Sequence, residues 1–358
     1  LLKFSVKRER SVLILKNSFI FIIIFFFISA LPLFSQPQIT HGPVVGAVTA
    51  ASAKILVRLD RQASVRFELD SDAAFSNPMA TTSVVAEPDS DFFAIVPVQG
   101  LLPDSDYFYR AVIDGVPQSS TGSFRSFPAP GTASTFTFAF GGCQQAFRDA
   151  NSNIGRVWPL IVQDKPRFFL QLGDWTYPDT TDTQANPLDY FSVEYARVQS
   201  NYRSKYAPDY PMSKLFKIAP IDYVYDDHDF VNDNGDGSLP GAHNAIRGYR
   251  AMFPHYPLAN AKNGVWHKFT FGNADFFMLD NRAQRAPNMA AFRQTAEGDL
   301  LFRPDSAHLI LQANAQIDGE LQMDWLIREL QASTATWKFI GTSSTFNPDF
   351  SRAVIEYA

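Results

Sequence analysis

Polar side chains suited to metal binding follow three apolar runs of the sequence. The runs cover residues 136–140, 167–172 and 221–225. Cys143 follows the first, Asp174 and Tyr177 follow the second, and Asp226-Asp227-His228-Asp229 follows the third. Each run has the length and composition of a β-strand. Because ligands bind outside the carboxyl ends of strands in open α/β sheets, we expect these groups to form one site.

The donor types predict two metal ions of different character. Asp174 comes directly after a glycine that permits a tight turn, so its carboxylate is suited to bridging two ions. A thiolate from Cys143 and a phenolate from Tyr177 favour a trivalent or otherwise strongly acidic ion, since both must lose a proton to bind. A harder divalent ion, such as calcium or magnesium, suits the oxygen donors Asp227, Asn232 and Asn234. Two such ions, roughly 3.5 to 4 Å apart, serve phosphoester hydrolysis.

Three further residues complete the predicted site. Negative neighbours favour the protonated form of His228, which suits a general acid or a phosphate-binding cation. Arg282 and Arg285 follow a predicted hairpin at residues 266–279 and are candidate ligands for the substrate phosphate. We therefore expect His228 and Asp174 to be the catalytic pair.

Two parts of this pattern have competing interpretations. A lone cysteine in an exported chain is often a small buried hydrophobic residue, so Cys143 has that alternative to metal ligation. Residues 232–237 resemble the start of an EF-hand loop, but His243 occupies the twelfth position, where glutamate is expected. A surface turn rich in Asn, Asp and Gly is the simpler interpretation of residues 233–237.

The pattern before residue 128 differs from the pattern after it. Residues 39–127 contain short alternating runs and the hairpin signal Asp114-Gly115, which predict an all-β sandwich. Residues 128–131 read as a linker, and strand, helix and strand patterns follow. The predicted organisation is a β-sandwich at 36–130 followed by a mainly α/β domain at 131–358.

The amino-terminal segment has the pattern of an export signal. Residues 1–35 place basic residues ahead of an apolar run from Phe19 to Phe34, which is short for a bilayer-spanning helix. We expect cleavage near residue 35, export by the general secretory route, and no stable membrane span afterwards. A net charge of −5 among 358 residues gives no nucleic-acid-binding signal. Oligomeric state is not indicated.

Four blocks, in order, resemble the alkaline phosphatase D (PhoD-like) family of the metallophosphatase superfamily. The blocks are Phe140-Gly-Gly-Cys-Gln-Gln145, Leu172-Gly-Asp-Trp-Thr-Tyr177, Asp226-Asp-His-Asp229 with Asn232, and Leu279-Asp-Asn-Arg282. Residues 42–127 are also similar to that family's fibronectin-like amino-terminal domain. The resemblance implies that residues 36–130 form a fibronectin-like sandwich and that residues 131–358 form an α/β, metallophosphatase-type mixed β-sandwich flanked by helices.

The resemblance implies hydrolysis of phosphate monoesters or diesters by a metal-activated hydroxide. It implies iron(III) held by Cys143, Asp174 and Tyr177, and calcium beside it with Asp227 and Asn232 among the ligands. It also gives His228 the role of proton donor. The family's carboxy-terminal Gly-Asp-x-His block is absent before residue 358, and the adjacent arginine pair of a twin-arginine signal is absent near residues 7–10. From the first absence we expect a chain truncated at its carboxy-terminal end. The second favours the general secretory route for export.

The sequence thus predicts an exported phosphoesterase that acts on a small-molecule or polymer phosphoester. The alternative is a catalytically incomplete exported protein with a binding or adhesion role, suggested by the β-sandwich and the acidic, Asn-rich loop. The choice of substrate depends on loops such as residues 180–201, whose shape the sequence does not determine.

Overall fold

The computed structural model describes residues 35–144, 157–181, 190–260, 262–285, 287, 292–302 and 320–344. The predicted export signal, except for its last residue, lies outside these residues. The amino-terminal part contains β1 (Ile39–Gly46), β2 (Ser52–Leu59), β3 (Ala63–Asp70), β4 (Met79–Ala80), β5 (Val84–Ala86), η1 (Pro88–Ser90), β6 (Phe93–Gln99), β7 (Asp106–Ile113) and β8 (Val116–Arg125). The following part begins with β9 (Ala139–Gly141), α2 (Val157–Asp164), β10 (Phe169–Leu172), α3 (Pro178–Thr181), η3 (Phe191–Val193), α4 (Tyr195–Tyr206), η4 (Pro211–Lys217), β11 (Ile221–Val224), α5 (Asp227–Phe230) and α6 (Ala242–Met252). It continues with β12 (His267–Phe271), β13 (Ala274–Met278), β14 (Phe292–Gln294), β15 (Leu300–Phe302), α7 (Gln322–Ala332) and β16 (Trp337–Gly341).

The amino-terminal strands form two sheets whose apolar faces pack together. One sheet has the order β1-β2-β6, and the other contains β4-β3-β7-β8 with β5 also paired to β3. Alternate residues of β3 are buried, among them Val65, Phe67 and Leu69, as the period of two predicts. The hairpin of β7 and β8 turns at Asp114-Gly115, where both residues have left-handed φ angles of 45° and 83°. The predicted β-sandwich is therefore confirmed.

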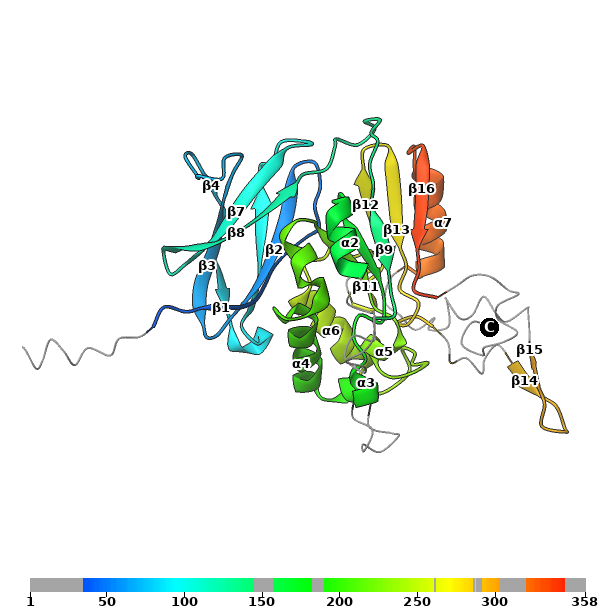
Figure 1. The fold of residues 1–358 in the computed structure, drawn as a ribbon. Coiled ribbons are helices and arrows are strands. Elements are labelled where there is room, and N and C mark those ends of the chain that lie inside the picture. Colours follow the sequence, from blue (N-terminus) through cyan, green and yellow to red (C-terminus); the bar gives the residue numbers. More distant parts are fainter. Residues whose placement is uncertain are drawn as a thin grey trace, which may run out of the picture. The chain divides into compact units, whose positions relative to one another are not determined.

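Two further sheets face each other in the carboxy-terminal part. Strands β9, β10 and β11 are parallel, and β13 pairs antiparallel with β12 and parallel with β16 (Figure 1). Phe138 and Phe168 come from the first sheet and lie 5.3 Å, centroid to centroid, from Phe276 of the second. Aromatic pairs of this kind contribute about 0.5–1.5 kcal/mol beyond the burial of their surface. The core between the two sheets is thus largely aromatic.

Helices cover the outer faces of these sheets. On β9-β10-β11, Trp158 of α2 contacts Phe169, and Tyr249 of α6 contacts Tyr223. On β13, Trp325 of α7 packs against Phe277. Residues 168 and 169 and residues 276 and 277 therefore point to opposite faces of their sheets, as the pleat requires. This arrangement is the expected mixed β-sandwich flanked by helices.

Several boundaries differ from the sequence prediction. The strand expected over 136–140 is β9, which covers only Ala139–Gly141 because pairing with β10 begins at Ala139. Asp318, followed by apolar residues at helical spacing, predicts a helix that it caps; α7 instead begins later, with Leu321 at its N-cap, and Asp318 lies outside the described residues. The hairpin around Gly272-Asn273 is confirmed by the pairing of β12 with β13.

Polar and aromatic contacts join the amino-terminal sandwich to the sheets that follow. Lys54 donates from Nζ to the carbonyl of His255 at 2.7 Å, and the hydroxyl of Tyr256 donates to the carbonyl of Val48 at 2.7 Å. The ring of Phe127 lies 5.4 Å from that of Phe168. These residues belong to one compact unit, Gln38–Ala358. Within the described part of the chain, no helix combines the length and apolar character needed to cross a membrane.

Candidate metal centre

Parallel strands bring the predicted donors to one edge of a sheet. β9 leads to Cys143, β10 leads to Asp174, and β11 leads to Asp226 and the short helix α5. Hydrogen bonds cross between these strand ends: the amide of Cys143 donates to the Gly173 carbonyl at 3.1 Å. The expected meeting of three strand ends is therefore what the fold produces.

The backbone at this edge takes unusual conformations. Cys143 and Asp174 have left-handed φ angles of 56° and 51°, and Gly173 has a φ of 95°. A β-carbon on Gly173 would lie 2.5 Å from that of Asp226, so the close approach of β10 to β11 requires glycine there. Non-glycine residues in the left-handed region cost on the order of 1–3 kcal/mol each and cluster at functional sites.

Two predicted ligands of the trivalent ion, Cys143 and Tyr177, lie beside the carboxylate of the third, Asp174. The hydroxyl of Tyr177 lies 3.0 Å from Oδ2 of Asp174, and the sulfur of Cys143 lies 3.6 Å from the same oxygen. The other oxygen, Oδ1 of Asp174, is buried and has no hydrogen-bond partner among the described residues. Cys143 itself is exposed, which contradicts the alternative that it is a buried hydrophobic residue.

Three potential ligand atoms, one each from Asp174, Asp227 and His228, lie within 4.8 Å of one another. The donor set, with the thiol and phenol beside it, fits a strongly acidic ion next to a harder one. Oδ1 of Asp174, buried with no partner among the described residues, also supports metal binding. A bound cation would compensate the cost of burying this charged oxygen. The residues present are therefore suited to hold metal ions.

The protons of these acids are tightly held without a compensating cation. Burial and the charges of Asp229, Asp226 and Asp227 raise the pKa of Asp174. The residue Cys143 is exposed, but partial burial of its sulfur, together with the charge of Asp174, raises the pKa of the thiol to about 11. Burial and the charge of Asp174 also raise the pKa of the Tyr177 hydroxyl. Metal binding at this site must therefore be coupled to proton release.

His228 lies between two carboxylates and beside the ring of Tyr177. Its Nδ1 is 2.6 Å from Oδ2 of Asp179, and its Nε2 is 3.5 Å from Oδ1 of Asp233. The ring centroids of His228 and Tyr177 are 4.4 Å apart. Burial alone would lower the pKa of His228, but the hydrogen bond and charge of Asp179, with the charges of Asp227 and Asp174, raise it to about 9. The imidazolium form is thereby favoured.

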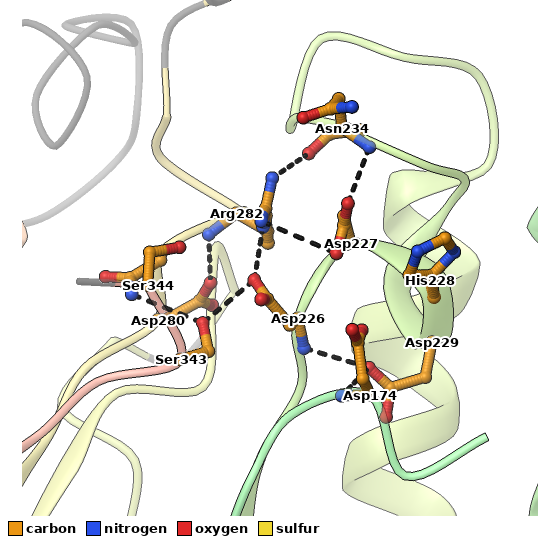
Figure 2. Close-up of polar contacts among 12 residues, drawn as sticks. Asp174, Asp226, Asp227, His228, Asp229, Asn234, Asp280, Arg282, Ser343 and Ser344 are labelled. Atoms are coloured by element: carbon orange, nitrogen blue, oxygen red, sulfur yellow. Dashed lines mark hydrogen bonds and ion pairs between the residues drawn. The ribbon is translucent and has the colours of Figure 1, made fainter. Parts of the chain in front are cut away.

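Arg282 is a buried counter-ion of the aspartates that precede and begin α5. Its Nε donates to Oδ1 of Asp226 at 2.5 Å, and one terminal nitrogen lies 3.5 Å from Oδ1 of Asp227 (Figure 2). Ser343, which follows β16, donates to the same Asp226 oxygen at 2.9 Å. Burial opposes ionisation of Asp227, yet Arg282 and the amide of Asn234 lower its pKa. Asp227 is thus held as a carboxylate.

The remaining predicted residues lie around this cluster. Arg285 is buried, and its amide lies 3.4 Å from the Arg282 carbonyl. Asn232 lies in the turn after α5, where its carbonyl accepts from the amide of Gly235 at 2.7 Å. In the same loop, Asp233 and Asn234 are exposed, but Asp236 is buried and accepts from the amide and hydroxyl of Ser238, so the expected surface turn holds for only part of residues 233–237. The roles expected of Arg282, Arg285 and Asn232 in binding remain proposals.

Sequence reasoning did not find Asp179 or Ser343. Asp179 stands five residues after Asp174 in a region read only as a loop, and nothing in its spacing indicates a histidine partner. Ser343 reaches Asp226 only because β16 joins the sheet beside β13. Both contacts depend on tertiary structure.

The fold is of the metallophosphatase type. It is similar to a purple acid phosphatase from yellow lupin (Lupinus luteus) seeds, with a TM-score of 0.55 and 13% identity over 85% of this chain and 50% of that one. It is also similar to a solved structure of PhoD, with a TM-score of 0.67 and 21% identity over 86% of this chain and 63% of that one.

The chain belongs to the PhoD-like phosphatase family. That family's model matches residues 138–352, and the model of its amino-terminal domain matches residues 29–128. Alkaline phosphatase D of Bacillus subtilis (strain 168) is 25% identical over 354 residues, which cover 90% of this chain and 58% of the relative. The resemblance seen in the sequence is confirmed, and the chain spans less than two thirds of these relatives' length.

Proposed function

We propose that the protein hydrolyses phosphate esters, monoesters or diesters, at the centre formed by Asp174 and its neighbours. The observation that carries this proposal is the convergence of Cys143 and Tyr177 on one oxygen of Asp174, while its other oxygen is buried with no partner among the residues that the structure describes. Asp227 and His228 supply further donor atoms within 4.8 Å. Membership of the PhoD-like phosphatase family supports the same activity.

Each residue has a defined role in this proposal. Metal ions held by Cys143, Asp174, Tyr177 and Asp227, with Asn232 as a further ligand, would neutralise the phosphoryl group and activate a water molecule. His228, held by Asp179, donates a proton to the leaving oxygen. Arg282 pairs with Asp226 and Asp227, and Arg282 and Arg285 are the proposed contacts for the substrate phosphate.

The proposed metals are iron(III) and calcium. Thiolate and phenolate donors beside a carboxylate support a trivalent ion at Cys143, Asp174 and Tyr177. The carboxylate of Asp227, kept ionised by Arg282, supports a harder ion as its neighbour. Asp174 would supply carboxylate oxygens to both ions.

We further propose that the protein is exported. The basic and apolar pattern of residues 1–35 supports a cleaved signal peptide, followed by a sandwich domain at 36–130 and a catalytic domain at 131–358. The substrate is a small-molecule or polymer phosphoester.

Removal of metal should abolish hydrolysis. Protein expressed from the full reading frame should hydrolyse p-nitrophenyl phosphate or bis(p-nitrophenyl) phosphate, lose the activity after dialysis against a chelator, and regain it when iron and calcium are returned. Elemental analysis verifies the removal. Unchanged rates in metal-free protein would contradict the metal centre, and hydrolysis of neither substrate would favour the binding or adhesion role.

The colour of the protein should depend on Tyr177. Phenolate bound to iron(III) absorbs visible light, so Tyr177→Phe should lose a visible band that the parent protein has. Tyr210→Phe is a matched control, because Tyr210 is buried near the site but bonds to Gln144 and the Trp175 carbonyl. A colourless and iron-free preparation that is fully active would rule out this metal assignment.

A further inference from the structure

The carboxylate of Asp229 holds two strand ends together beneath the metal centre. Its Oδ1 accepts from the amides of Asp174 at 3.2 Å and Asp226 at 2.8 Å, and its Oδ2 accepts from the amide of Trp175 at 3.1 Å (Figure 2). Asp229 is itself buried. One side chain therefore fixes the turn after β10 and the turn after β11.

A lysine from a distant helix completes the bonding of Asp229. Lys205, in the last turn of α4, is fully buried, and its Nζ lies 3.3 Å from Oδ2 of Asp229. Nζ also donates to the hydroxyl of Tyr223 at 2.6 Å, and that hydroxyl donates to the same Asp229 oxygen at 2.5 Å. Oδ2 of Asp229 thus receives a charge and a hydroxyl in addition to the Trp175 amide.

The surroundings of Lys205 are aromatic. Nζ lies 4.6 Å from the ring centroid of Tyr202, 4.5 Å from that of Tyr223 and 5.8 Å from that of Trp175. Rings at these distances stabilise a cation and leave no solvent to replace Asp229 as its partner. Apolar residues can often replace a buried ion pair without loss of stability. The buried Lys205–Asp229 pair is therefore weak evidence that these residues serve stability alone.

The contacts of Asp229 act on a residue with an unusual backbone conformation. Asp174 has a left-handed φ of 51°, and its amide and the following amide both donate to Asp229. Such a conformation persists only when the surrounding structure holds it. The orientation of the Asp174 carboxylate therefore depends on Asp229, and that of Asp229 depends on Lys205 and Tyr223.

We propose that Lys205 is a positioning residue of the metal centre, which acts through Asp229 and Tyr223 to hold the Asp174 turn in its metal-binding conformation. This inference rests on the metal binding that the proposed function requires, and not on the identity of the substrate. Lys205 would act on Asp174 through Asp229 and the backbone amides that Asp229 accepts from, and the charge of Asp174 also acts directly on the pKa of Lys205. Groups that orient metal ligands typically change metal affinity about 10- to 100-fold when they are removed.

The test compares Lys205→Met with Tyr206→Phe in the full protein. Lys205→Met keeps an unbranched side chain but removes the charge. Tyr206→Phe is the control, because it removes a buried hydrogen bond made by the same helix, from the Tyr206 hydroxyl to the Met252 carbonyl. We expect Lys205→Met to lose half of its metal at about tenfold lower chelator concentration. Hydrogen exchange at the amides of Asp174, Trp175 and Asp226 should accelerate, and Tyr206→Phe should change neither quantity.

A second variant keeps the test decisive if Lys205→Met does not fold. Tyr223→Phe retains the ring and Lys205 but removes the hydroxyl between Lys205 and Asp229, so it should accelerate exchange at the same three amides. Wild-type exchange and metal retention in a folded Lys205→Met or Tyr223→Phe protein would overturn the inference. A parent protein that binds metal but hydrolyses no phosphoester would instead refute the proposed function and leave this inference standing.

Discussion

Replacing Asp174 with asparagine should cost the protein its bound metal and reduce kcat by at least about 10²–10³-fold, the scale seen when a group that stabilises transition-state charge is removed. Asparagine preserves the shape of the side chain, and its oxygen can still accept from Tyr177. It removes the negative charge that both proposed ions share. The measurements are kcat with p-nitrophenyl phosphate and metal content by elemental analysis.

The same substitution should not destabilise the metal-free protein. Oδ1 of Asp174 is buried and has no partner within the described part of the chain. Burial and the neighbouring carboxylates raise the pKa of the group, so its charge opposes folding when no metal is bound. Asp222→Asn is the matched control, because Asp222 is a buried aspartate of β11 that pairs with His267 at 2.9 Å. Asp222→Asn should lower the melting temperature of the protein and leave its metal content unchanged. Full activity and metal content in Asp174→Asn would remove Asp174 from the mechanism.

The donors that follow strands were predictable because parallel strands end at one edge of their sheet. Cys143, Asp174 and Asp227 each stand within a few residues of an apolar run, and the runs became β9, β10 and β11. The fold class followed from the same patterns, since alternation in β3 and the Asp114-Gly115 turn are local features. Local sequence therefore carried most of the architecture and the identity of the candidate ligands.

The second layer of contacts was not predictable, because it joins residues far apart in the chain. Arg282 bonds to Asp226 across 56 positions, and Ser343 bonds to the same carboxylate across 117. Lys205 lies on an amphipathic helix, where a lysine ordinarily points to solvent, yet here it is fully buried. Such pairings depend on how sheets and helices pack, and no spacing rule in the sequence encodes them.

If His228 is the general acid, the fall in kcat caused by His228→Gln should depend on the leaving group of the substrate. A general acid matters most when the departing oxygen is strongly basic, so His228→Gln should lower kcat by roughly 10²–10⁴-fold with an alkyl phosphate. The loss should be much smaller with p-nitrophenyl phosphate, whose leaving group departs without a proton. His243→Gln is the control, because His243 is an exposed histidine near the start of α6.

Metal content separates this role from ligation. The ring of His228 lies between Asp179 and Asp233, which supports an imidazolium that donates a proton, although one of its nitrogens is also within 4.8 Å of the Asp174 and Asp227 oxygens. If His228 is the acid, His228→Gln keeps its metal, and Asp179→Asn shows the same leaving-group dependence in weaker form because it loosens the imidazolium. If His228→Gln loses metal and is equally slow with both substrates, His228 is a ligand, and the leaving oxygen must obtain its proton from another group.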